Sequence, residues 1–238
     1  MCSLCDRSGD RAQFGSRRTF LQFAGAAAAT LAVPAASFAA KNPPKPQNVV
    51  SPDAALDRLM SGNGRYVQGV SKRHDFRHER EALAQGQNPY AGILSCADSR
   101  IAPEFAFDTG RGDLFVCRVA GNFLNDDVVA SIEYAVAVLN TPLLMVLGHQ
   151  ACGAVEATIK SIKDGTTLPG HLPSLVAAIG AAIKPNQTLD DAIRQNVVFN
   201  VGKMKAATPI IDKAVADKKV RVVGALYHLD TGHIELLS

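Results

Sequence analysis

The chain has 238 residues, of which 47% are hydrophobic and 20% are charged, and its formal net charge is +3. This composition excludes a disordered chain, a collagen-like repeat and a small disulfide-stapled scaffold. The length suffices for one domain, or at most two, around a substantial hydrophobic core. Because the chain has no Trp and no Lys- or Arg-rich run, nothing in it predicts a nucleic-acid-binding surface.

The first 39 residues have the features of an export signal. Arg17 and Arg18 precede an apolar, alanine-rich run, and small residues follow up to Ala39. This order is typical of a secretory signal, and the paired arginines resemble the twin-arginine type. The alternative is a short membrane anchor, but the apolar run is only about half of the roughly 20 residues that a membrane span needs. We therefore predict that residues 1–39 are a cleaved signal peptide and residues 40–50 a linker.

These features predict a bacterial protein that is periplasmic or otherwise exported, with no membrane attachment after cleavage. Three cysteines then remain, Cys96, Cys117 and Cys152. In an oxidising compartment two of them could form a disulfide unless a metal binds them. Cys2 and Cys5 have a Cys-x-x-Cys spacing, but they belong to the predicted signal peptide and are given no role.

Predicted helices and strands alternate along residues 51–238. Ser51 can cap a first helix that Pro52 begins, although the glycines of residues 62–69 weaken its pattern. Short apolar runs predict the strands, and apolar residues repeated every three or four positions predict the helices. The further predicted elements are, in chain order, helix 79–84, strands 91–95 and 114–119, helix 126–139 capped by Asn125, strand 143–147, helices 154–163, 172–183, 189–207 and 212–218, and strands 220–226 and 234–237.

Strands that alternate with helices predict an α/β fold, here a single domain around a mainly parallel β-sheet flanked by helices. The turn at residues 230–232 is expected to return the last strand as an antiparallel edge strand near the C-terminus.

Reactive side chains follow two of the predicted strands. Cys96, Asp98 and Arg100 follow one strand, and His149 and Cys152 follow another. Because loops at the carboxyl ends of parallel strands line a crevice, a functional site is expected there. Two thiolates and one imidazole suit zinc, and three protein ligands leave a fourth position for water or substrate, as in catalytic zinc sites. A structural site closed by Asp98 is the alternative.

Asp98 and Arg100 are spaced for an ion pair. A bidentate pair with Arg100 would hold the Asp98 carboxylate away from a metal and lower its pKa. Asp98 would then be a fixed acceptor for the proton of a nucleophile. An ordinary ion pair in a turn is the alternative interpretation.

The pattern Cys96-x-Asp98-x-Arg100, followed after 53 residues by His149-x-x-Cys152, resembles the β-class carbonic anhydrases. The resemblance runs from about Ser51 to the C-terminus. It extends to the segments 62–66, 112–116, 118–122, 131–136 and 224–237.

The resemblance implies that Cys96, His149 and Cys152 bind one Zn²⁺ per subunit, and that Asp98 with Arg100 orients the nucleophile. The implied activity is that of a carbonic anhydrase (carbonate dehydratase), a zinc lyase. It carries out the reversible hydration of CO2 to bicarbonate and a proton by metal-bound hydroxide. Two alternatives remain: hydrolysis of CS2 or COS at the same zinc site, and a non-catalytic exported zinc-binding protein.

The resemblance also implies a substrate pocket lined by Gln87, Phe115 and Tyr134. In the family this pocket lies at a dimer interface and the neighbouring subunit supplies part of it, so a homodimer or a dimer of dimers is expected. Taken alone, the two aromatic residues would be interpreted as core residues. Arg118 matches an arginine of an inhibitory bicarbonate site in one subgroup, but Ile93 replaces the Trp of that site, so we predict a structural role for Arg118.

Proton transfer and thiol chemistry are less well defined by the sequence. Any of five histidines could relay the proton to solvent, and none is preferred: His74, His78, His171, His228 and His233. A thiol oxidoreductase is disfavoured because Cys96 and Cys152 are 56 residues apart and no Cys-x-x-Cys occurs after the predicted signal.

Overall fold

The structure is a computed structural model of the chain and describes residues 49–237. The predicted signal peptide, residues 1–39, and most of the predicted linker lie outside the described residues, so both stay predictions. Among the described residues, no helix has the length and apolar character that crossing a membrane requires.

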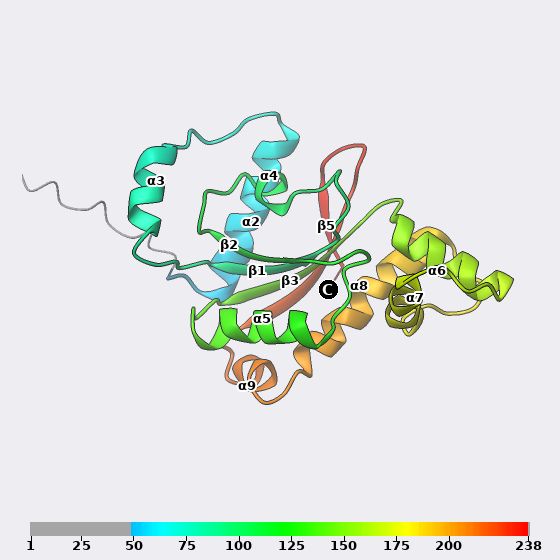
Figure 1. Cartoon of the computed structure of the whole chain (residues 1–238). Coiled ribbons are helices and arrows are strands. Elements are labelled where there is room, and N and C mark those ends of the chain that lie inside the picture. Colours follow the sequence, from blue (N-terminus) through cyan, green and yellow to red (C-terminus); the bar gives the residue numbers. More distant parts are fainter. Residues whose placement is uncertain (1–48, 238) are drawn as a thin grey trace, which may run out of the picture. The chain divides into compact units, whose positions relative to one another are not determined.

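A five-stranded sheet lies at the centre of the described fold, with the strand order β2-β1-β3-β4-β5 (Figure 1). Its strands are β1 (Ala91–Ser95), β2 (Leu114–Arg118), β3 (Leu143–His149), β4 (Arg221–Tyr227) and β5 (Ile234–Leu236). The first four strands are parallel, and β5 pairs antiparallel with β4 at the edge. This arrangement confirms the predicted mainly parallel α/β sheet with an antiparallel edge strand.

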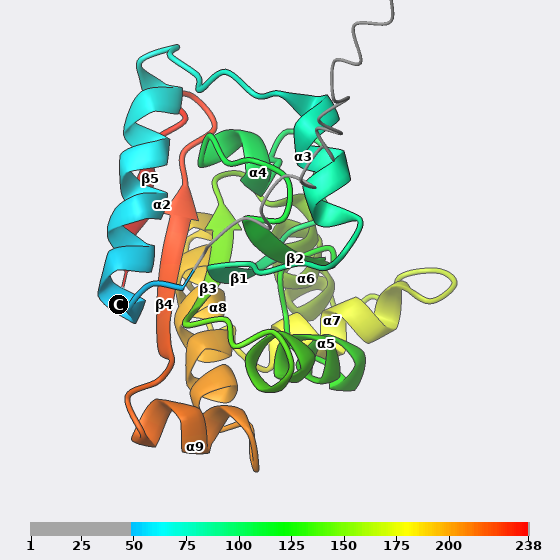
Figure 2. The ribbon, with the colours of Figure 1, turned by 90° about the vertical axis from the view of Figure 1, so that its left-hand side faces the viewer.

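Helices cover both faces of the sheet (Figure 2). The described helices are α2 (Pro52–Val67), α3 (Phe76–Leu83), α4 (Pro103–Ala106), α5 (Asp126–Ala137), α6 (Gly153–Asp164), α7 (Leu172–Gly180), α8 (Leu189–Lys205) and α9 (Ile211–Ala216). Successive residues of a strand face opposite sides. Ile93 accordingly packs with α2 and α4, whereas Leu94 packs with α5, α8 and α9.

Helix α2 continues through the glycines that weakened its sequence pattern. Its first turn is capped by Ser51, whose side chain accepts a hydrogen bond from the backbone of Ala54. At Gly62 a Cβ would collide with the carbonyl oxygen of Phe107. The glycine is therefore needed where α2 meets the end of α4, and packing against the sheet compensates for its low helix propensity. Helix α4 has only four residues and gave no periodic signal in the sequence.

The strand ends position the reactive residues. β1 and β3 are paired in parallel, so that Ser95 lies opposite Leu147, and β3 continues two residues further to His149. Helix α6 begins at Gly153, directly after the turn that follows β3. Figure 1 shows α6 and α7 beyond this end of the strands.

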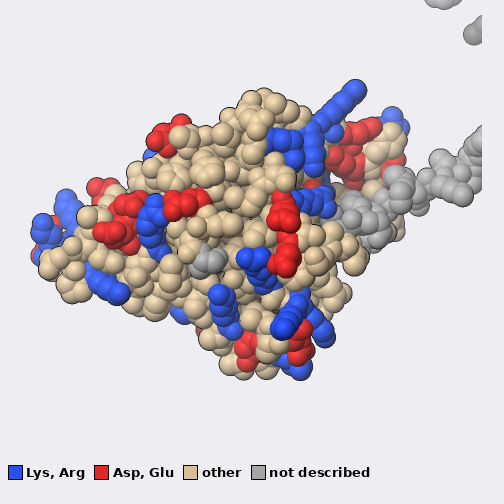
Figure 3. All heavy atoms as spheres, turned by 180° about the vertical axis from the view of Figure 1, so that it is seen from behind, with Lys and Arg blue, Asp and Glu red and all other residues tan. Residues whose placement is uncertain are grey.

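The surface of the described fold carries charges of both signs. On the face seen in Figure 3, acidic and basic side chains are interspersed over the part formed by described residues. A mixed surface of this kind produces no broad field of one sign.

Candidate metal centre

Three buried ligand atoms meet at the carboxyl edge of the sheet. Cys96 follows β1, His149 ends β3, and Cys152 is the residue that precedes the first turn of α6. One ligand atom from each lies within 4.8 Å of the other two. The two sulfurs are 4.0 Å apart, which is about twice the length of a disulfide bond. Both cysteines are free. The structure thus brings the three residues together as separate ligands rather than as a cystine.

The turn between β3 and α6 directs Cys152 back toward the end of β1. Ala151 adopts a left-handed conformation with φ of 49°, which a small side chain tolerates better than a bulky or β-branched one. As the N-cap residue of α6, Cys152 lies at the positive end of the helix dipole, where an anionic sulfur is stabilised.

One ring nitrogen of His149, Nδ1, is hydrogen-bonded to the backbone. Its Nδ1 lies 2.8 Å from the carbonyl oxygen of Gln150, so Nδ1 donates a proton and Nε2 keeps a free lone pair. Nε2 is buried and has no hydrogen-bond partner within residues 49–237, although buried polar atoms are nearly always paired. An unpaired imidazole nitrogen beside two sulfurs is the donor set that zinc prefers. The residues present therefore fit a zinc ion.

The two thiols influence each other's ionisation in opposite directions. The hydrogen bond from the Cys152 thiol lowers the pKa of Cys96, and the backbone N–H of Gly121 contributes further. Conversely, the neighbouring Cys96 sulfur and burial raise the pKa of Cys152. One negative charge therefore forms easily at this site, whereas a second requires a cation between the sulfurs.

Asp98 and Arg100 form a bidentate ion pair in the loop after β1. The Nη2 and Nε atoms of Arg100 donate to the two carboxylate oxygens of Asp98 at 2.7 and 2.9 Å. The backbone N–H of Arg100 donates to the same carboxylate at 2.9 Å. These bonds hold the pKa of the Asp98 carboxyl well below its usual range. Its Oδ2 lies 3.8 Å from Nε2 of His149, so a permanently ionised acceptor stands beside the three ligands.

Two arginines brace the loop that carries these residues. Arg100 also donates to the carbonyl oxygen of Ala151 at 3.1 Å, which ties the loop after β1 to the turn after β3. Arg118 donates to the carbonyl oxygens of Cys96, Asp98 and Ile101 at 2.7 to 2.9 Å. This geometry agrees with the structural role predicted for Arg118, because its guanidinium is already engaged by the protein backbone.

One contact to a ligand was missed by sequence analysis. The backbone N–H of Gly121 donates to the sulfur of Cys96 at 3.2 Å. Gly121 belongs to the segment 118–122 of the family resemblance, but a glycine there gives no signal that its N–H contacts a sulfur. Only the folded backbone shows this contact.

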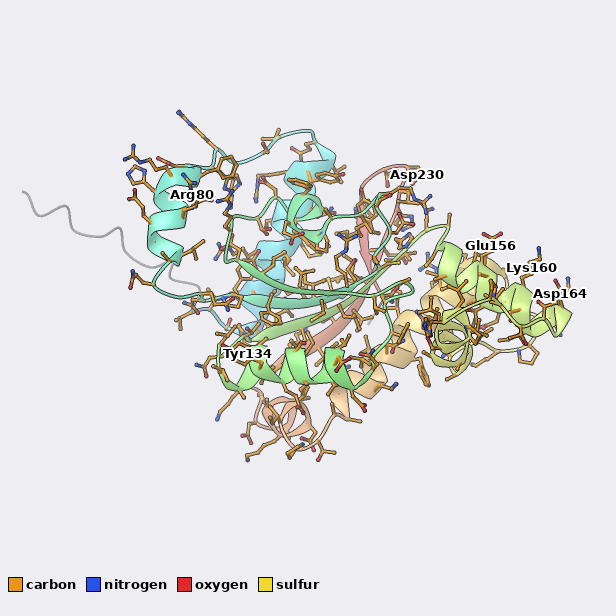
Figure 4. The ribbon with its side chains drawn as sticks, viewed as in Figure 1. Arg80, Tyr134, Glu156, Lys160, Asp164 and Asp230 are labelled. Carbon is orange, nitrogen blue, oxygen red and sulfur yellow. The ribbon has the colours of Figure 1, made fainter. Side chains whose placement is uncertain are left out.

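The predicted pocket residues lie away from the three ligands within one chain. Gln87 is exposed and precedes β1, at the opposite end of that strand from Cys96. Phe115 pairs with Gly92 near the start of β1, and its ring centroid lies 6.3 Å from that of Tyr134. Tyr134 is 48% exposed and lies at the end of α5 remote from α6 (Figure 4). The two aromatic residues therefore meet each other, and Gln87 precedes the end of β1 at which Phe115 pairs.

Comparisons with known proteins point to one family. A family model described as carbonic anhydrase matches residues 91–234. "Carbonic anhydrase 2" of Mycobacterium tuberculosis is 39% identical over 192 residues, covering 78% of this chain and 93% of the relative. The carbonic anhydrase of Mycolicibacterium smegmatis is 38% identical over 194 residues, covering 79% of this chain and 94% of the relative.

Solved β-carbonic anhydrases share the fold. One of two tetrameric enzymes from Sordaria macrospora aligns with a TM-score of 0.62 at 23% identity, covering 78% of this chain and 98% of that one. The β-carbonic anhydrase CcaA aligns with a TM-score of 0.60 at 24% identity, covering 77% and 87%. The Coccomyxa enzyme in complex with acetazolamide aligns with a TM-score of 0.56 at 25% identity, covering 78% and 82%.

Replacing one ligand should abolish metal binding, whereas replacing Cys117, the third free cysteine of the described residues, should not. We expect Cys152→Ala to lose the zinc that the purified wild-type chain retains, because two ligands hold the ion too weakly. Cys117→Ala is the matched control, because Cys117 is a free, half-buried cysteine on β2. Zinc content is measured by elemental analysis against protein concentration. An undiminished zinc content in Cys152→Ala would refute the ligand set.

Proposed function

This chain belongs to the β-class carbonic anhydrase family, and on that premise we propose which residues carry out its reversible hydration of CO2 to bicarbonate and a proton. The proposal assigns Cys96, His149 and Cys152 as ligands of one Zn²⁺ per subunit. It rests on the buried Nε2 of His149, which has no hydrogen-bond partner among the described residues, and on the three ligand atoms of these residues, which lie within 4.8 Å of one another. When bound, zinc supplies the Lewis acidity that makes water a nucleophile near neutral pH.

Asp98 orients the attacking water. Its low pKa keeps the carboxylate ionised at neutral pH, so it can only accept hydrogen bonds. Arg100 fixes both oxygens, and the second lone pair of Oδ2 remains available near His149. A water held by Asp98 has one O–H bond directed away from the substrate, which leaves an oxygen lone pair for the carbon of CO2. Arg100 acts through Asp98 and is a positioning residue.

Replacing the carboxylate by an amide should separate metal binding from turnover. We expect Asp98→Asn to retain zinc and to lower kcat for CO2 hydration about 10²-fold, because an amide can donate a hydrogen bond to the water as well as accept one. Asp164→Asn, at the exposed end of α6 (Figure 4), is the control and should leave kcat unchanged. Stopped-flow hydration assays measure both variants. A wild-type kcat in zinc-loaded Asp98→Asn would remove Asp98 from the mechanism.

We propose that Gln87, Phe115 and Tyr134 complete the substrate pocket of a neighbouring subunit. Within one chain, Gln87 precedes β1 and Phe115 lies near the start of β2, whereas Cys96 follows the end of β1. Strand β2 forms an edge of the sheet, and Tyr134 is half exposed. Aromatic rings at such an edge can form an apolar wall for CO2 when a second subunit packs there. A homodimer or a dimer of dimers would therefore be the active form, with CO2 and bicarbonate as its ligands.

Mixed oligomers test whether the pocket is shared. Asp98→Asn and Gln87→Ala chains, co-expressed with different affinity tags and purified through both, should form oligomers more active than either parent. The reason is that one site then combines an intact Asp98 with an intact Gln87 from the partner. Activity should not exceed about half that of the wild type, since the other site of each pair carries both changes.

The control mixes two chains that each carry one change, in Asp98 or in Cys96, because both residues serve the site of their own chain. Mixed oligomers of Asp98→Asn and Cys96→Ala chains should recover nothing, because every site lacks one of the two groups. Failure of the first mixture to exceed its parents, with both tags present, would mean that Gln87 serves its own chain.

We further propose that the enzyme acts in the periplasm or is otherwise exported, on the basis of the signal-like residues 1–39. The exported protein should begin at residue 40 when its intact mass is measured. Replacing both Arg17 and Arg18 by Lys should leave the full-length precursor in the cytoplasm. A mature protein that keeps residues 1–39 would contradict the proposed cleavage.

A further inference from the structure

We propose that Asn196 and Asn200 on α8 are positioning residues that fix the hydrogen bond from Gly121 to the sulfur of Cys96. This inference rests on the proposed role of Cys96 as a zinc ligand. The two asparagines are far in sequence from the metal-ligand motifs. Through Gly121 they would influence the electron density and the position of the Cys96 sulfur.

A continuous chain of hydrogen bonds joins α8 to the sulfur. The N–H of Gly121 donates to Sγ of Cys96 at 3.2 Å. The side-chain amide of Asn196 donates to the carbonyl oxygen of Gly121 at 2.8 Å. The amide of Asn200, one helical turn further on, donates to Asn196 at its backbone oxygen (2.8 Å) and at Oδ1 (3.0 Å). Oδ1 of Asn200 accepts a hydrogen bond from the backbone N–H of Leu124 at 2.9 Å.

The two asparagines thus hold both ends of one short segment, residues 121–124. Both side chains are 1% exposed, and the buried face of α8 around them is otherwise apolar, with Val197 and Val201. Buried amides are costly unless they are fully paired. Apolar side chains in their place would leave the carbonyl of Gly121 and the N–H of Leu124 without these partners. The pair therefore serves the segment rather than the packing of α8.

Gly121 has more backbone freedom than any other residue type, so its orientation depends on the bonds around it. Its φ is 83°, and a Cβ would collide with Ile179, so only glycine fits. The next residue, Asn122, also has a positive φ, of 40°. Asparagine tolerates the left-handed region better than most residues, and the backbone N–H of Asn122 closes the turn by donating to the carbonyl oxygen of Val119 at 2.9 Å. The N–H and the carbonyl of Gly121 lie in adjacent peptide planes of this closed turn, so the bond from Asn196 to the carbonyl restricts rotation of the turn and with it the direction of the N–H.

An N–H donor on a ligating sulfur has two consequences. It withdraws electron density from the thiolate, and it fixes the direction from which the sulfur can bind a metal. Loss of an outer hydrogen bond of this kind typically weakens metal binding about 10- to 100-fold. Loss of this hydrogen bond also raises the energy of the sulfur electrons, which moves a sulfur-to-metal charge-transfer band to longer wavelength.

The test replaces Asn196 by Leu, which is similar in size but cannot bind the carbonyl of Gly121. Zinc is replaced by Co²⁺ in the full chain, and the sulfur-to-cobalt band is recorded in the near-ultraviolet. We expect the band of Asn196→Leu to move to longer wavelength, and zinc affinity, measured by chelator competition, to fall about 10- to 100-fold. Val201→Ala is the control, because it also disturbs the buried face of α8 but leaves the hydrogen bonds in place.

The outcomes separate this inference from the proposed function. A wild-type cobalt protein without a sulfur band would overturn the ligand set, and the inference with it. A sulfur band and a zinc affinity that are the same in Asn196→Leu as in the wild type would overturn the inference alone. Equal changes of the sulfur-to-cobalt band and of the zinc affinity in Asn196→Leu and Val201→Ala would also overturn the inference. If Asn196→Leu does not fold, Asn196→Ala is measured against the same control and judged in the same way.

Discussion

The arrangement of the site follows from one constraint, the burial of two thiols and one imidazole nitrogen within 4.8 Å. Water cannot solvate such groups, so each needs a proton, a hydrogen bond or a cation. The surrounding chain favours the cation. The carbonyl of Gln150 selects the ring nitrogen that is free, the start of α6 favours an anionic Cys152, and the N–H of Gly121 favours an anionic Cys96. These contacts come from different parts of the sheet's carboxyl edge, and together they prepare a site for zinc.

The guanidinium groups of Arg100 and Arg118 bind different kinds of acceptor near the site. Arg100 binds a carboxylate in two places, which keeps Asp98 ionised and pointing in one direction. Arg118 binds three backbone carbonyls, which fixes the path of the loop itself. Five N–H donors in a planar fork make both arrangements possible, and a lysine could not reproduce either. The two sets of bonds meet at Asp98, because Arg100 holds its carboxylate and Arg118 holds its backbone carbonyl.

One chain brings together the three candidate metal ligands and the Asp98–Arg100 ion pair, but it does not place the aromatic residues beside them. Phe115 and Tyr134 contact each other near the start of β1, whereas Cys96 follows its end. An apolar substrate such as CO2 has no charge for the dyad to bind, so a wall that excludes water must supply much of its recognition. The proposed assembly would therefore be part of the catalytic apparatus, since subunit packing would bring the aromatic residues of one chain to the metal site of another.

The sequence alone predicted the order of the described elements except α4, the mainly parallel sheet and the candidate ligands, because these depend on local patterns. Apolar runs mark buried strands, Ser51 and Asn125 mark helix starts, and Cys96 and His149 follow strands whose ends must share an edge. Which atoms meet is visible only in the tertiary structure: the contact of Gly121 with a sulfur, the bonds of Arg118 to three carbonyls, and the hydrogen bonds of two asparagines on α8. Backbone donors and acceptors are the same in every residue, so their partners are fixed only when distant segments pack together.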